Sequence, residues 1–525
     1  MRRLLFRLAL GGAIGALASL GGCSSDDPAP GGAGGAGGGG GGGAAGAAPG
    51  RNAQCTTRLG APAIDRAGTC VALTSPDCPN VVGPIVEDDN AVLLGSLFSL
   101  SGPNQSSGVA RQNSIELAVR ALNDRGGLPP AAEGGALRPL AFVGCDEARP
   151  DPANAGQTTR VAAAKHLVSL GVAAVIGAGA SGATIDVATN GTLPAKTLLI
   201  SPSSTAIAIS SLPGATVDGE RLVWRTAPSD TTQAEALRAS LEGLAGAGAK
   251  VAVVHRNDAY GKGLSSALAS GLTLGGAPAT AENLVDIEYD GAKPPEQLTD
   301  AVDALAAFGP TVVVLVGTAE AITGVLVPYE ARLEAGAARP QYLISDGGRR
   351  DDLVKALGAS PDPEGLRTRV RGTSPGVPTV LAQNFFNLVY KRAFPESPQL
   401  IFGMAGAYDA AFLLAYAAVA AGDRPLDGPA MAAGLRRTVG GALAINAGAS
   451  DANKAFEELR QGRAIDFNGA SGPLEFDPAS GEAASDINVW CVGVNPNDRS
   501  FYLKDDSKQY YDATARALTG AFACE

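Results

Sequence analysis

Residues 173–205 read AAVIGAGASGATIDVATNGTLPAKTLLISPSST, and this stretch decides the fold. Its first apolar run, Ala173 to Ile176, has no polar alternation and ends at Gly177, which is typical of a parallel strand buried on both faces. A second such run, Leu198 to Ile200, ends at Ser201-Pro202. We therefore expect a strand, turn, helix, loop and strand, with both turns at the edge where open α/β sheets bind ligands.

Small hydroxyl residues stand in both turns. The first turn holds Ser181 and Thr184, and the second holds Ser203, Ser204 and Thr205. Each turn opens toward a helix, whose first N–H groups are free and carry a partial positive charge. The pattern therefore predicts that the two turns bind a carboxylate.

The same stretch has competing interpretations. Residues 177–182, GAGASG, match the G-x-G-x-x-G pattern of a dinucleotide site. That pattern belongs on the first strand of its unit, but strand-like runs at 92–98 and 140–144 come earlier, and no acidic residue follows the next strand. A further alternative is that the glycines only allow close packing of the helix on the strand. We expect no cofactor.

Composition narrows the class of protein. The 525 residues, 45% of them hydrophobic and 18% charged, suffice for two or three globular domains. A net charge of −11 argues against nucleic acid as a partner. The two histidines, His166 and His255, match no zinc spacing, and the G-x-S-x-G match at 372–376 has no later histidine to complete a hydrolase. We expect a binding protein, with no metal and no catalytic residue.

The N-terminus predicts export. Basic residues 1–3 precede an apolar run, Leu8 to Leu20, that is too short to span a membrane. The sequence LGGC at 20–23 resembles a bacterial lipobox, so we expect a signal peptide over 1–23 and lipidation of Cys23; an ordinary secretory signal is the alternative. The residue after Cys23 is Ser24 and not Asp, and resemblance to enterobacterial lipoprotein sorting then implies the outer membrane. Residues 24–50 are Gly-rich and predict a flexible tether.

Six further cysteines suit an oxidising compartment. Residues 51–90 contain three of them and form an extension whose purpose the sequence does not reveal. Six cysteines allow 15 pairings, and Cys491 with Cys524 is our first choice, as a clip on the C-terminal tail. The candidates are Cys55, Cys70, Cys78, Cys145, Cys491 and Cys524.

Strands and helices then alternate twice along the chain, which predicts an α/β fold with two doubly wound, parallel-sheet lobes. We assign 91–226 and 373–465 to the first lobe, and 227–372 and 466–525, with the tail, to the second. The expected strands are 92–98, 140–143, 173–176, 198–200, 222–225, 251–254, 284–287, 311–316, 342–344 and 487–494. The expected helices are 109–122, 158–170, 232–244, 298–308, 321–335, 379–392 and 405–420.

Several short motifs over 91–480 carry a family resemblance. They are SGP at 101–103, NDRGGL at 123–128, VIG at 175–177, SPSST at 201–205, VVH at 253–255, YGKG at 260–263, AYDA at 407–410 and GPLEFD at 472–477. In this order and spacing the chain resembles the type I periplasmic solute-binding proteins, specifically the branched-chain amino-acid-binding group of ABC importers. The resemblance implies two lobes joined by three crossovers, near 226–229, 371–376 and 463–472, that close on a solute.

The resemblance also implies a binding site. Ser181, Ser203 and Thr205 match the positions that bind an amino acid's carboxylate. Asp346 matches the acidic residue that pairs with the ammonium group; its alternative is a purely structural role in capping the turn. Tyr260 matches an aromatic residue of the cleft. The expected ligand-binding set is Ser101, Ser107, Ser181, Gly182, Ser203, Ser204, Thr205, Tyr260, Thr318 and Asp346.

Two departures bear on the ligand. Ser107 and Thr318 stand where the amino-acid binders usually have aromatics, so the pocket walls are smaller or more polar. We expect an exported, membrane-anchored lipoprotein that captures an amino acid or a related small carboxylate and delivers it to an ABC permease. The alternative is a lipid-tethered sensor or envelope scaffold that uses the same fold without transport.

Overall fold

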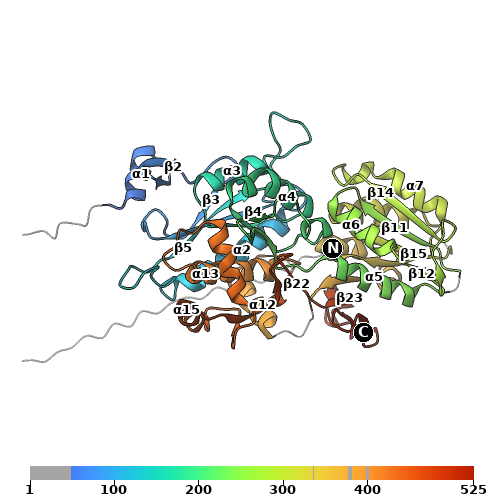
Figure 1. Ribbon diagram of the computed structural model, residues 1–525. Coiled ribbons are helices and arrows are strands. Elements are labelled where there is room, and N and C mark those ends of the chain that lie inside the picture. Colours follow the sequence, from blue (N-terminus) through green and yellow to red (C-terminus); the bar gives the residue numbers. More distant parts are fainter. Residues whose placement is uncertain (1–48, 247, 335, 377–380, 398–400, 525) are drawn as a thin grey trace, which may run out of the picture. The chain divides into compact units, whose positions relative to one another are not determined.

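The computed structural model describes residues 49–246, 248–334, 336–376, 381–397 and 401–524. The predictions of a signal peptide, of lipidation at Cys23 and of nearly all of the tether concern residues 1–48, outside the described residues. Within the described ranges, no helix combines the length and the apolar character needed to cross a bilayer. Two large sheets organise the chain (Figure 1).

The first sheet has the strand order β21-β22-β10-β7-β6-β4-β5-β3. Its central parallel strands are β4 (Val92–Phe98), β5 (Leu140–Asp146), β6 (Ala174–Gly177), β7 (Leu198–Ser201) and β10 (Val223–Arg225). Its outer strands are β3 (Asn80–Val82), β21 (Phe476–Asp477) and β22 (Glu482–Ala483). Because β5 and β6 lie on opposite sides of β4, the strand order reverses there, and open α/β sheets bind ligands at such a point.

Helices cover both faces of this sheet, because alternate side chains of a strand point to opposite faces. In β4, Leu94 and Phe98 share a core with α2 and α13, whereas Leu93 and Leu97 share one with α3 and α4. All seven residues of β4 are buried, as the lack of polar alternation predicts. Figure 1 shows α2 beside α13. These helices are α2 (Gln105–Asn123), α3 (Arg160–Ser169), α4 (Ser181–Val187) and α13 (Met404–Ala420).

The second sheet repeats this arrangement in the order β14-β11-β15-β16-β17-β23-β25-β26, with β24 also paired to β23. Its parallel strands are β11 (Val251–Arg256), β14 (Leu284–Tyr289), β15 (Val312–Val316), β16 (Gln341–Ile344) and β17 (Val370–Pro375). One face packs on α5 (Asp230–Leu244) and α6 (Ala259–Ala269), the other on α7 (Thr299–Phe308), α9 (Val327–Arg332) and α10 (Asp351–Ala359). Here the order reverses beside β11.

The N-terminal extension is pinned to the first sheet. Its strand β3 pairs antiparallel with β5, and Cys78 forms a disulfide with Cys145 of β5. A second disulfide, Cys55–Cys70, joins the extension's own helix and hairpin. The extension therefore covers an edge strand that would otherwise expose unpaired backbone groups. Its remaining elements are α1 (Arg51–Leu59), β1 (Ala63–Arg66) and β2 (Thr69–Ala72).

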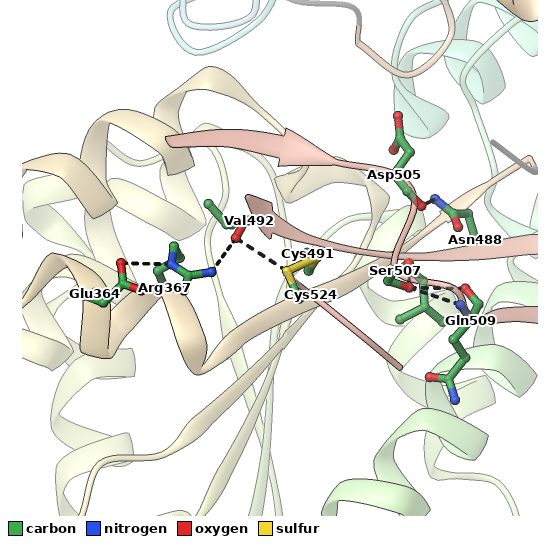
Figure 2. The surroundings of a disulfide bond; sticks show 10 residues. Glu364, Arg367, Asn488, Cys491, Val492, Asp505, Ser507, Gln509 and Cys524 are labelled. Atoms are coloured by element: carbon green, nitrogen blue, oxygen red, sulfur yellow. Dashed lines mark hydrogen bonds and ion pairs between the residues drawn. A yellow bond between two sulfur atoms is a disulfide. The ribbon is translucent and has the colours of Figure 1, made fainter. Parts of the chain in front are cut away.

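The C-terminal tail is fastened to the second sheet. Strand β23 (Ile487–Val494) pairs antiparallel with β17, β24 (Phe501–Lys504) and β25 (Tyr510–Asp512), and β26 (Ala517–Thr519) pairs with β25. Figure 2 shows the disulfide Cys491–Cys524, which confirms the predicted clip. Beside it, Arg367 donates a hydrogen bond of 2.9 Å to the carbonyl of Val492.

The strand pairing differs from our lobe assignment at one place. Strands β21 and β22 belong to the first sheet, so the third passage to the second sheet lies between β22 and β23 and not near 463–472. Two-residue strands carry no periodic signal, which is why the pattern of residues did not assign this segment to the first sheet. The predicted helix 321–335 is also divided, into α8 (Ala319–Ala321), the π-helical turn Ile322–Leu326 and α9.

The other described elements lie around these two sheets. They are β8 (Thr216–Val217), β9 (Glu220–Arg221), β12 (Thr273–Leu274), β13 (Ala277–Pro278), α11 (Pro363–Thr368), α12 (Leu381–Ala393), α14 (Gly428–Leu435), β18 (Leu443–Asn446), α15 (Ala452–Arg460), β19 (Ile465–Gly469) and β20 (Gly472–Pro473).

Candidate functional site

A cavity of about 110 Å³ lies where the carboxyl ends of the two sheets' strands meet. Its first wall follows β4, β5, β6 and β7 and consists of Ser99, Asn104, Ser107, Arg111, Glu147, Gly179, Ala180, Ser181, Ser203 and Thr205. Its second wall follows β11, β15 and β16 and consists of Arg256, Asp258, Tyr260, Thr318, Asp346, Gly347, Arg349 and Arg350. Ile401 and Phe402 complete the lining. The cavity therefore occupies the position that both strand reversals predict.

Seven of the ten predicted ligand-binding residues line this cavity: Ser107, Ser181, Ser203, Thr205, Tyr260, Thr318 and Asp346. Three do not. Ser204 is fully buried, its hydroxyl 2.7 Å from that of Thr184 and 3.3 Å from the carbonyl of Ala178, so it holds the turn together. Gly182 lies within the first turn of α4, and the hydroxyl of Ser101 is buried with no hydrogen-bond partner among the described residues.

The hydroxyls of the first wall also organise the wall. Ser181 accepts a hydrogen bond of 3.2 Å from the backbone N–H of Ala206, and Ser203 donates one of 2.9 Å to the carbonyl of Gly179. These bonds join the turn after β6 to the turn after β7. The two turns that we predicted from sequence therefore form one surface.

Helix α2 contributes to the same wall because it packs closely on the end of β4. A Cβ at Gly108 would stand 1.9 Å from the carbonyl oxygen of Ser99, so glycine permits the approach. The guanidinium of Arg111, one turn further on, donates through Nε and Nη2 to the carbonyl of Phe402 at 3.2 and 2.9 Å. Burial lowers the pKa of Arg111 to about 10, an effect that the charge of Glu147 opposes, so Arg111 is a cation at neutral pH.

Glu147 is the acidic group of the first wall. It accepts hydrogen bonds from the hydroxyl of Ser99 at 2.9 Å and from the N–H of Gly179 at 2.8 Å. Burial raises the pKa of Glu147, while these two hydrogen bonds and the charge of Arg111 oppose the rise. Neither Arg111 nor Glu147 was predicted: the pattern around Arg111 indicates only a helix, and Glu147 follows β5 directly, beyond the strand end that we expected at 143.

Asp346 is the acidic group at the centre of the second wall. Its Oδ1 accepts hydrogen bonds from the hydroxyl of Tyr260 at 2.6 Å and from Nε2 of Gln233 at 2.9 Å. Burial raises the pKa of Asp346 against these bonds. Gly347 allows the turn to approach β15, since a Cβ there would stand 2.5 Å from the carbonyl oxygen of Gly317.

A second buried carboxylate stands behind Asp346. Asp230, the first residue of α5, is fully buried. Burial, and then the charge of Asp346, raise the pKa of Asp230 well above its usual value. The charge of Asp346 therefore disfavours ionisation of Asp230, and a cation bound beside the two carboxylates would oppose that effect. Asp230 was not predicted as a site residue; it follows directly after the expected crossover at 226–229.

Three arginines complete the electrostatics of the second wall. Arg256 forms ion pairs with Asp258 at 2.6 Å and with Glu320 at 3.2 Å. Arg349 pairs with Asp505 at 2.6 Å, and Arg350 pairs with Asp352 at 3.1 Å. Arg256 follows the predicted strand end at 254 closely, which was the signal that could have identified it, whereas Arg349 and Arg350 lie in the longer loop after 344.

The remaining wall is polar. Ser107 is buried, and the hydroxyl of Thr318 lies 3.3 Å from Nη1 of Arg256. These two residues, where aromatics were expected by resemblance, leave the cavity lined by small hydroxyls. In the part of the chain that the structure describes, no group of three or more His, Cys, Asp or Glu side chains is arranged to hold a metal ion.

Comparisons with known proteins agree with this architecture. A family model described as "Periplasmic binding protein" matches residues 91–493. A curated relative from Halobacterium salinarum, the chemotactic signal transduction system substrate-binding protein BasB, is 27% identical over 392 residues, which cover 74% of this chain and 84% of the relative.

Solved structures share the fold. A leucine-binding protein, LivK, from Thermotoga maritima is 19% identical with a TM-score of 0.57, covering 79% of this chain and 98% of its own. A type 1 periplasmic binding protein from Bordetella pertussis is 19% identical with a TM-score of 0.58, covering 79% of this chain and 100% of its own. These likenesses confirm the predicted α/β fold with mostly parallel sheets.

Proposed function

Because this chain belongs to the periplasmic binding protein family, whose members bind solutes and are not enzymes, we propose that it captures an amino acid or a related small carboxylate in the cavity between its two sheets. Family membership implies an extracytoplasmic location. It also agrees with the expectation that the chain has no catalytic residue.

The complementary chemistry of the two walls supports this solute class. The first wall offers the hydroxyls of Ser181 and Thr205 where a carboxylate would lie, and the second offers Asp346 to an ammonium group. A carboxylate and a carboxylate-binding turn on opposite sides of one cavity suit a zwitterion. The proposal assigns the anion to Ser181, Ser203 and Thr205, and the cation to Asp346, with Tyr260 beside it.

We also propose how the protein is attached to the membrane and which partner receives the solute. Cys23 carries the lipid anchor, the Gly-rich tether spans 24–50, and the anchor lies in the outer rather than the inner membrane. The two sheets form two lobes that close on the solute, which then passes to an ABC permease. The leucine-binding protein of Thermotoga maritima supports the amino-acid part of this proposal.

Thermal unfolding of the full-length protein tests the solute class. The panel contains amino acids, small carboxylates and amides. A solute at about 100 times its dissociation constant adds about 2.7 kcal/mol to the free energy of unfolding and raises Tm visibly. A rise with amino acids or carboxylates is the expected result. No rise across the panel would contradict the proposal.

A sensor is the second candidate function, and one observation favours it. The relative from Halobacterium salinarum is named as part of a chemotactic signal transduction system. Uptake of the labelled solute by cells with and without the gene separates the two functions. Lost uptake supports the importer, whereas unchanged uptake with a lost behavioural response supports the sensor.

A further inference from the structure

The cavity contains more positive charge than a simple zwitterion needs. Resting on the proposed function, we propose that the solute carries a second acidic group, as an acidic amino acid does, and that Arg111 and Arg350 hold this group between them. Arg111 belongs to helix α2 of the first wall, and Arg350 follows β16 in the second. Both line the same cavity.

Arg111 has a donor to spare. Its Nε and Nη2 are occupied by the carbonyl of Phe402, which holds the guanidinium in one plane, whereas its Nη1 donates to no described group. A planar guanidinium held in this way is suited to bind a carboxylate or another flat oxyanion. Arg111 is partly buried, and desolvation is the main reason why its pKa is lowered, so an anion that reaches it is partly withdrawn from water.

Arg350 faces the cavity with two donors to spare. Its Nε donates to Asp352 at 3.1 Å, and neither of its terminal nitrogens donates to a described group. The side chain is only 11% exposed. The charge of Arg350 also lowers the pKa of Arg111, so the two cations lie close enough to repel each other. An anion placed between them removes that repulsion.

The other cations of the cavity are engaged elsewhere. Arg256 is held between Asp258 and Glu320, and Arg349 is paired with Asp505. The hydroxyls of the first wall are assigned to the solute's first carboxylate, and Asp346 to its ammonium. A second acidic group therefore has the two-arginine clamp, Arg111 with Arg350, as its partner among the described lining residues.

The size and polarity of the cavity suit this class. A water molecule needs about 10–15 Å³ on this scale, so about 110 Å³ holds roughly seven to eleven waters, or a solute of roughly ten non-hydrogen atoms. An amino dicarboxylic acid is of that size. Ser107 and Thr318 line the cavity with hydroxyls, which favour a charged side chain over a branched aliphatic one.

Isothermal titration of the full-length protein with matched pairs tests the clamp. Glutamate is compared with glutamine, and aspartate with asparagine, because each pair differs only in an acid against an amide. In at least one pair we expect the acid to bind ten times more tightly or better. Arg350→Gln should abolish that preference, and Arg350→Lys should retain part of it. Arg332→Gln, which removes an exposed arginine of α9 paired with Asp303, is the control and should leave the preference unchanged.

The outcomes separate this inference from the proposed function. If neither acid is preferred over its amide, or if Arg350→Gln keeps the preference while it unfolds like the wild type, the clamp is refuted and the proposed function stands. If no amino acid or carboxylate binds at all, the proposed function itself fails. The affinities of the wild type for each acid and its amide test the clamp even if an arginine variant does not fold.

Discussion

Asp409 connects helix α13 to the loop that follows β19, and its charge should make the protein less stable as the pH rises. The carboxylate is fully buried and accepts hydrogen bonds from the N–H groups of Ala470 and Ser471, both at 2.7 Å, and from the hydroxyl of Ser471 at 2.6 Å. Burial raises the pKa of Asp409 to about 6 against these three bonds.

The size of the effect follows from that pKa. The ordinary pKa is 3.8, so the pKa of Asp409 in the folded protein lies about 2.2 above its pKa in the unfolded chain. At 1.36 kcal/mol per unit this amounts to about 3 kcal/mol. Because the folded-state pKa is raised, this stability is present below pH 3.8 and is lost as the pH rises through about 6.

Urea unfolding of wild type and of Asp409→Asn, at a series of pH values from 3 to 7, measures this contribution. The amide cannot ionise, so the free energy of unfolding of wild type should fall by about 3 kcal/mol relative to the variant over this range. The variant also loses hydrogen bonds, because the NH2 group of the amide cannot accept them. This loss lowers its free energy of unfolding equally at every pH and does not change the dependence on pH. Asp423→Asn, at an exposed position just after the same helix, is the control. Parallel curves for wild type and Asp409→Asn would refute the argument.

Three further predictions concern the site, the tail and the anchor. Asp346→Asn should weaken binding of the tightest amino acid about 10- to 100-fold by calorimetry, because a charge-assisted hydrogen bond to the ammonium is lost; equal affinity would exclude that role. Replacing Cys491 and Cys524 by serine should lower the free energy of unfolding by about 3–4 kcal/mol, as expected for a closed loop of 33 residues, and unchanged stability would mean that the tail is held without the bond. Cys23→Ser should move the protein from the membrane to the soluble fraction on cell fractionation, and retention in the membrane would contradict lipidation there.

Much of the fold was predictable because parallel strands buried on both faces appear in the sequence as short apolar runs without polar alternation. The run at 92–98 and the strand at 487–494 were predicted with the bounds that the structure has. The disulfide between Cys491 and Cys524 was predictable because both cysteines fall in the tail after the last repeat unit. Strand order within each sheet was not predicted, because alternating strands and helices do not by themselves indicate which strands are neighbours.

The site was predicted in part, and the missing part has a physical reason. The hydroxyls of the first wall follow strands directly, so the pattern of the chain points to them. Asp230 and Arg111 depend on neighbours that are distant in sequence: burial, and then the charge of Asp346, raise the pKa of Asp230, and the carbonyl of Phe402 orients Arg111. No local pattern records such pairings, and the pairing of β21 and β22 with the first sheet is likewise not visible in the local sequence.

The two sheets share one strand order, β5-β4-β6-β7-β10 in the first and β14-β11-β15-β16-β17 in the second. Each sheet therefore supplies half of a recognition surface, and neither half encloses a solute. The affinity for the solute then depends on how strongly each half binds it and on the free energy of bringing the two halves together. Substitutions in the three connecting segments should consequently change the affinity, although these segments do not contact the solute. Evolution can therefore change the affinity through these segments while the residues of the two walls keep the specificity.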